Sequence, residues 1–145
     1  MEQRIIKIDL GGAINKPVGY TSVDINPKAD IVCDLERSEL PFQNNEVNEL
    51  RASHTLEHIE NLIPLMNECW RILKKDGTFW IAVPKFPHTD AVRDPTHKRF
   101  FVKESFDYFT EKYSYLDYGI KLWKILSLQE KENEIICILQ PVNDI

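Results

Sequence analysis

The stretch RIIKIDLGGAINKPVGYTSVDIN, residues 4–26, decides how the first half of the chain folds. Residues 4–9 are rich in β-branched side chains and stop at a pair of glycines, which predicts a strand. Residues 20–25 predict a second strand. Only nine residues, 11–19, separate Leu10 from Tyr20, and these are too few for a helix of ordinary length with its two connections. We therefore expect the helix between these strands to be absent or reduced to a single turn.

The rest of the chain alternates short apolar runs with few helical patterns. Further strands are predicted at residues 29–33, 48–53 and 78–84, and the last of these is apolar enough to be covered on both faces. A helix with one buried face is predicted over 62–75, with Asn61 as its cap and Gly77 at its end. A second helix is predicted over 103–113, after about twenty irregular residues. Strands at 120–128 and 134–140 must be antiparallel, because the turn between them is too short for a crossover.

The whole-chain properties favour one soluble domain, residues 1–145. Apolar residues make up 43% and charged residues 28%, which is ordinary for a folded globular protein. The net charge of −5 and the lack of a dense basic run argue against nucleic acid and anionic membranes as partners. We find no signal sequence or apolar run of transmembrane length, so a cytoplasmic location is expected.

These elements predict an α/β fold with a C-terminal antiparallel pair. In an open sheet of this kind, ligands bind beyond the carboxyl ends of the strands. The polar residues that close the first four strands are Asp9, Asp24, Asp34 and His54. We expect them to lie along one edge.

Four runs then carry a specific resemblance: IDLGGA, YTSVDINPKADIVCDLE, LPFQNNEVNELRASHTLEHI and ECWRILKKDGTFWIAVP. In this order and spacing, over about residues 5–106, the chain resembles the S-adenosylmethionine-dependent methyltransferases of the seven-strand Rossmann-like class, type 11 branch. The resemblance implies a mostly parallel sheet, S-adenosyl-L-methionine as cofactor, and methyl transfer to an acceptor. We expect the acceptor to be a small molecule, which the sequence does not name.

The resemblance also implies roles for individual residues. It assigns the glycine loop to the amino-acid part of the cofactor, the acid of the second strand to both ribose hydroxyls, the acid of the third to the adenine edge, and the end of the fourth strand to the sulfonium side. The cofactor-binding residues implied are Asp9, Gly11, Gly12, Asp24, Ile25, Asp34, Leu35, Ser53 and His54.

The chain departs from the family pattern at the glycine loop. Ala13 stands where family members usually carry a second glycine, and the following helix is reduced. We therefore expect weak cofactor binding, or a site completed by a partner or by a second subunit in a homodimer.

The irregular segment 85–102 is predicted to cover the acceptor side, since so long a connection in a small domain is usually functional. Its His97 and Arg99 are candidate catalytic residues facing the acceptor. The alternative is that Asp94 and Arg99 only pin the loop. His97 or His54 has a suitable pKa range for a general base. The histidines and acids lack a recognisable ligand spacing, so no metal site is expected.

Two other functions stay open from the sequence. A noncatalytic binding or regulatory subunit could keep the sheet and lose the glycine loop. A nicotinamide oxidoreductase could share the strand, glycine and acid pattern, but the acid follows Gly11 by only thirteen residues and the full G-x-G-x-x-G is missing.

Overall fold

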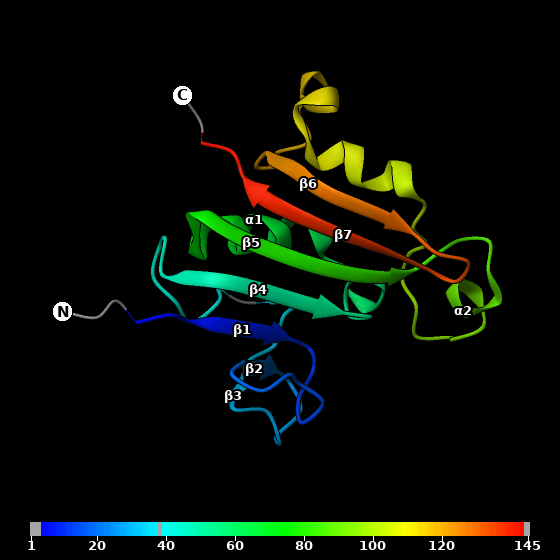
Figure 1. Ribbon diagram of the computed structural model, residues 1–145. Helices are drawn as coiled ribbons and strands as arrows, with labels where there is room; N and C mark the ends of the chain where they lie inside the picture. The colour runs from blue at the N-terminus through cyan, green and yellow to red at the C-terminus, as the bar shows by residue number, and fades with distance from the viewer. Residues whose placement is uncertain (1–3, 38, 144–145) are drawn as a thin grey trace.

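The computed structural model describes residues 4–37 and 39–143, and these form a seven-stranded sheet in the order β3-β2-β1-β4-β5-β7-β6 (Figure 1). The strands are β1 (Lys7–Leu10), β2 (Thr21–Asp24), β3 (Ile31–Val32), β4 (Val47–Ser53), β5 (Leu73–Pro84), β6 (Trp123–Glu130) and β7 (Glu134–Pro141).

Strands β1 to β5 run parallel, and β7 lies antiparallel between β5 and β6. The predicted fold class is therefore confirmed. Residues 11–20 contain two turns and no helix: the Asn15 amide donates to the Gly12 carbonyl, and the Tyr20 amide donates to the Pro17 carbonyl. The reduced connection between the first two strands is thus confirmed as well.

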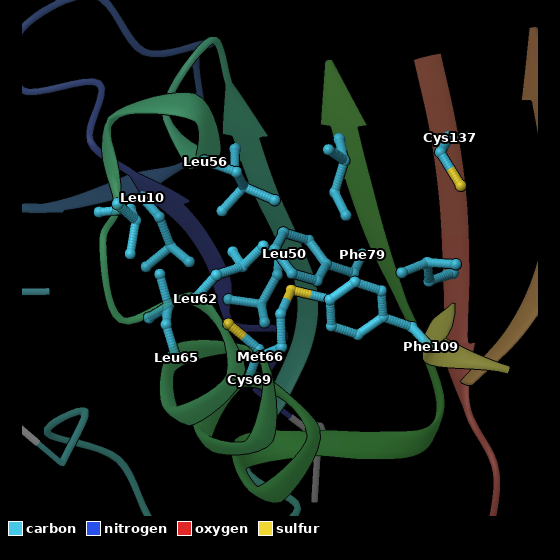
Figure 2. Close-up of a cluster of buried hydrophobic side chains, with 14 of the residues drawn as sticks. Leu10, Leu50, Leu56, Leu62, Leu65, Met66, Cys69, Phe79, Phe109 and Cys137 are labelled. Atoms are coloured by element: carbon cyan, nitrogen blue, oxygen red, sulfur yellow. The ribbon is translucent and has the colours of Figure 1, made fainter. Parts of the chain in front are cut away.

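Helix α1 (Leu62–Ile72) supplies the main cover for one face of the sheet. Its apolar residues recur at intervals of three and four, so they form one face. Figure 2 shows Leu62, Leu65, Met66 and Cys69 directed at the side chains of β1, β4 and β5. No helix in the described part of the chain is long and apolar enough to cross a membrane.

The opposite face of the sheet is more open. Figure 1 looks onto it, and none of the helices of the described chain lies in front of β4, β5 and β7. Ile136 and Ile138 alternate with buried neighbours on β7 and are only partly buried, as is Trp80 on β5. The expectation that the fifth strand is covered on both faces was therefore wrong for its first part and holds only for its last residues, Ala82 to Pro84.

The first predicted helix ends earlier than expected. It stops at Ile72, and β5 begins at once with Leu73, so Gly77 lies inside the strand and does not end the helix. A side chain at Gly77 would meet the Asn48 carbonyl oxygen at 2.9 Å, so the glycine allows β5 to approach β4 closely. Asn61 is the N-cap residue, but its side chain makes no capping hydrogen bond.

The second predicted helix is replaced by two 3₁₀ segments, η2 (Lys103–Phe109) and η3 (Glu111–Leu116). Phe106 and Phe109 are both buried and three residues apart. Because a 3₁₀ helix has three residues per turn, this spacing puts both rings on one face. The sequence pattern was read as an α-helix because the two periods differ little over so short a segment.

Candidate functional site

A cavity of about 340 Å³ opens at the carboxyl ends of the parallel strands. It brings together the loop after β1, the end of β2, the segment after β3, and the segment from the end of β4 through the 3₁₀ helix η1 (Leu56–His58). Its lining residues are Gly11, Asp24, Ile25, Asp34, Leu35, Glu36, His54, Thr55, His58 and Ile59.

The glycine loop is built around two bare α-carbons. A side chain at Gly11 would lie 2.4 Å from Thr55 Oγ1, and one at Gly12 would lie 1.6 Å from Asp9 Oδ2. Gly11 also has a φ of +82°, which favours glycine. Thr55 Oγ1 donates to the Leu10 carbonyl at 2.9 Å, which ties the loop to the end of β4.

Ala13 keeps the backbone conformation of a glycine. Its φ is +47°, in the left-handed region that costs an L-residue about 1–2 kcal/mol. The turn is closed just after it, where the Asn15 amide donates to the Gly12 carbonyl at 2.7 Å. The substitution therefore leaves the path of the loop intact while adding strain to it.

Asp9 lies behind the cavity and is fully buried. Its Oδ1 accepts a hydrogen bond from Arg51 Nη1 at 3.1 Å, while Oδ2 has no hydrogen-bond partner among the described residues. Burial raises the pKa of Asp9, and the neighbouring Arg51 opposes this shift. Asp9, Gly12 and Ser53, all three expected to bind the cofactor, are not lining residues; Asp9 and Gly12 support the loop from behind.

The acids of the second and third strands do line the cavity, together with Ile25 and Leu35. Asp24 is the last residue of β2, and its carbonyl accepts a bond from the Cys33 amide at 3.0 Å. Asp34 Oδ1 accepts a bond from the Glu36 amide at 2.9 Å, which shapes the turn after β3.

Glu36 is a lining residue that the sequence reasoning missed. Its carboxylate oxygens accept bonds from the Glu60 and Asn61 amides, each at 3.0 Å, and so join the turn after β3 to the start of α1. Only a contact between segments distant in sequence reveals this role. Thr55 was missed for the same reason, although it lies within the diagnostic SHTLEHI run.

His54 lies at the end of β4 with a φ of +52° and lines the cavity. Its Nδ1 is 3.7 Å from Glu57 Oε2, and its Nε2 is 3.1 Å from Glu134 Oε1. The Glu57 carboxylate raises the pKa of His54; Glu134 adds to this, while partial burial opposes it. His54 is therefore a proton-binding group in the wall of the cavity.

The two candidate residues of the covering segment lie outside the cavity lining. The His97 side chain is 7% exposed and contacts the His58 ring edge to face, with ring centroids 4.8 Å apart and nearly perpendicular. Arg99 donates from Nε to the Ile59 carbonyl and from Nη2 to the Glu60 carbonyl. Arg99 thus pins the covering segment to the residues before α1, which is the structural alternative considered from the sequence.

Comparisons with known proteins agree with this geometry. Residues 14–81, just under half of the chain, match the methyltransferase domain family. A search of curated proteins found no match.

Several solved structures share the fold. One is a complex from Haloferax volcanii between the Trm112 methyltransferase activator and a protein described as a methyltransferase. The matching chain of that complex is 14% identical to this one and has a TM-score of 0.70. The match covers 99% of this chain and 85% of that chain. S-adenosylmethionine-dependent methyltransferases from Aquifex aeolicus and Archaeoglobus fulgidus have TM-scores of 0.66 and 0.67 at 14% and 16% identity. They cover 95% and 94% of this chain and 82% and 86% of theirs.

The fold and the edge cavity define a seven-stranded methyltransferase-type domain. With the family match over residues 14–81, the resemblance inferred from the sequence is confirmed: the chain is similar to the type 11 S-adenosylmethionine-dependent methyltransferases. The cofactor of this family is S-adenosylmethionine.

Proposed function

We propose that the chain transfers a methyl group from S-adenosylmethionine to a small-molecule acceptor. The observation that carries the proposal is the edge cavity itself, in which Gly11, Asp24 and Asp34 converge from three separate strand ends. This is the convergence that the family resemblance implies for the cofactor.

The described residues fit the cofactor in chemical type. Gly11 lines the cavity and would face the amino-acid part of the cofactor, while the absence of side chains at Gly11 and Gly12 lets the loop pack closely against Thr55 and Asp9. The Asp24 carboxylate suits a pair of ribose hydroxyls, because it can accept two hydrogen bonds. Asp34 and Leu35 line the cavity, and the family resemblance implies that the Asp34 carboxylate and the Leu35 amide would contact the adenine edge.

A bound S-adenosylmethionine supplies an already activated methyl group, so the protein needs mainly to align the reactants and exclude water. No covalent nucleophile is required. His54 lines the cavity and His97 does not, so His54 is the better candidate to accept a proton from the acceptor. Its carboxylate neighbours Glu57 and Glu134 would stabilise the imidazolium that forms.

A noncatalytic cofactor-binding or regulatory subunit is the second candidate, favoured by the strained Ala13 in the loop. Ile14 and Val18, in the loop between β1 and β2, and Val32, in β3, are also exposed. A partner or second copy covering them would complete the site. The Haloferax volcanii complex contains an activator protein, which supports looking for a partner of this kind.

Calorimetric titration with S-adenosylhomocysteine and, separately, with NAD tests the proposal. We expect one equivalent of S-adenosylhomocysteine to bind and NAD to give no saturable heat. Binding without turnover, after screening of acceptors, would favour the regulatory subunit. Binding of NAD alone would overturn both candidates in favour of the oxidoreductase.

A further inference from the structure

A second group of side chains adjoins the cavity and shares one lining residue, His58, with it. It consists of Glu57 and His58 from η1 and His97 from the covering segment, and we call it the Glu-His-His cluster. Each residue offers one ligand atom, and these atoms all lie within 4.8 Å of one another. The cluster brings together a carboxylate and two imidazoles from parts of the chain about forty residues apart.

Burial of the Glu57 carboxylate costs free energy unless a partner binds its oxygens. Its side chain is 2% exposed, and Oε1 has no hydrogen-bond partner among the described residues. A buried carboxylate oxygen without a partner carries a desolvation cost of a few kcal/mol. His54, which lines the cavity, has its Nδ1 3.7 Å from Oε2 of this carboxylate.

Hydrogen bonds hold both histidines in one tautomer. His97 Nδ1 is 2.8 Å from the Ala91 carbonyl oxygen, which can only accept, so Nδ1 carries the hydrogen. His58 Nδ1 is 3.0 Å from Thr96 Oγ1, whose own hydrogen is donated to Asp94 Oδ1 at 2.7 Å. His58 Nδ1 must therefore also be a donor, so in both neutral rings Nε2 keeps its lone pair.

This arrangement is typical of metal-binding histidines, which donate the other ring N–H to a carbonyl or a similar acceptor. His58 Nε2 lies 4.0 Å from Glu57 Oε2, and His97 Nε2 lies 3.6 Å from Asp94 Oδ2. Ligand atoms around a tetrahedral zinc ion would be about 3.3 Å apart. The cluster would have to contract by up to about 1.5 Å, which small side-chain rotations can supply, and Asp94 could supply a fourth ligand.

We propose that the Glu-His-His cluster binds a divalent first-row transition-metal ion, such as Zn²⁺. Two imidazoles and one carboxylate form a ligand set used by such ions, often with positions left open for substrate. Since His58 belongs to the cavity wall, the ion would lie next to the cavity. The site is assigned from the cluster alone, does not depend on methyl transfer, and replaces the sequence-based expectation that no metal binds.

The test titrates Zn²⁺ into the untagged, metal-free chain by calorimetry, without cofactor. We expect one equivalent to bind, and His58→Ala, His97→Ala and Glu57→Gln each to weaken binding by more than about 100-fold, because outer-shell partners alone are worth 10–100-fold. Thr96→Val, which removes the acceptor for His58 Nδ1 and the hydrogen bond from Thr96 Oγ1 to Asp94 but no ligand atom of the cluster, should weaken binding by about 10-fold.

His88→Ala is the matched control, since His88 is a histidine of the same covering segment that lies outside the cluster. It should leave the affinity for Zn²⁺ unchanged. Substitution with Co²⁺ in the unaltered chain gives a second readout, expected to show visible bands of a low-coordinate site without a thiolate charge-transfer band. No binding by the unaltered chain, equal binding by all variants, or a thiolate band would overturn the proposal.

Discussion

Ala13 illustrates at the scale of single residues why the glycine loop was hard to judge from sequence. The sequence shows the loss of a family glycine, whereas the structure shows that the left-handed backbone is kept, with a φ of +47°. Gly11 and Gly12, in contrast, have no room for any side chain. The loop therefore tolerates a side chain at position 13, where the cost is only backbone strain. It tolerates none at positions 11 and 12, where neighbouring atoms fill the space.

Replacing Ala13 by glycine should relieve this strain. We expect Ala13→Gly to raise the free energy of unfolding by up to about 1 kcal/mol, since the relief exceeds the entropy that glycine loses on folding. Affinity for S-adenosylhomocysteine should be equal or higher. Urea denaturation and calorimetry measure both quantities. Ala29→Gly is the control: Ala29 is not one of the residues of the described chain with positive φ, so glycine there should lower the free energy of unfolding. A large loss of affinity for S-adenosylhomocysteine in Ala13→Gly would contradict this account of the loop.

Removing the charge of Asp24 tests the ribose contact. Asp24→Asn should weaken S-adenosylhomocysteine binding by about 1.5–3 kcal/mol, the range for hydrogen bonds to a charged group. Asp76→Asn serves as control, because Asp76 is exposed in β5 and is not a lining residue. Equal affinities of the two variants in a calorimetric titration would remove Asp24 from the site.

His54 should make stability depend on pH. The pKa of His54 is raised in the folded chain, mainly by Glu57. Its contribution to the free energy of unfolding is therefore fully present below the unfolded pKa of about 6.5. That contribution is lost as pH rises through the folded pKa. Because His54 is half-exposed, the effect should stay below about 1 kcal/mol. His54→Asn suits the comparison, since asparagine tolerates positive φ.

Denaturation of both proteins with a chelator present, from pH 5 to pH 9, measures this effect. The unaltered chain should lose stability relative to His54→Asn as pH rises, and the trend should shrink when both proteins also carry Glu57→Gln. If the unaltered chain instead gained stability relative to His54→Asn as pH rises, the assignment of a raised pKa to His54 would be refuted.

The covering segment shows what is decided at the scale of elements. Residues 85–102 were expected to present His97 and Arg99 to the acceptor, yet the segment is fastened to the region of η1 and α1 by Arg99 and by the Lys98 amide, which donates to the Glu57 carbonyl. A pattern of charged residues in a loop does not reveal whether its side chains face a ligand or the protein's own backbone carbonyls. In the structure, Arg99 faces the protein's own backbone carbonyls.

Arg99→Ala should therefore act on stability. Losing the two charged hydrogen bonds to the Ile59 and Glu60 carbonyls should cost about 2–3 kcal/mol. The neighbouring Lys98 has an exposed side chain, so Lys98→Ala should change stability by less than about 0.5 kcal/mol. Affinity for S-adenosylhomocysteine should be nearly unchanged in both variants. A loss of affinity at unchanged stability would place Arg99 in the cofactor site instead.

At the scale of the whole molecule, the sheet could be predicted from sequence, and so could the strand ends that carry Asp24, Asp34 and His54. Hydrophobic runs and the polar residues that close them are local signals. Contacts between distant segments are not, and for this reason Glu36, Thr55 and the Glu-His-His cluster were missed. The 3₁₀ segments and the early end of α1 were also missed, because periodicity defines the boundaries of short elements poorly.

The central claim is that S-adenosylmethionine binds at the edge cavity. Titration of the ¹⁵N-labelled chain with S-adenosylhomocysteine, followed by amide chemical shifts, tests it most directly, because it detects even weak binding and locates it. The account predicts that the largest shift changes fall on Gly11, Ile25 and Leu35, which line the cavity in three separate segments. No shift changes at millimolar ligand, or changes confined to residues away from this cavity, would contradict it.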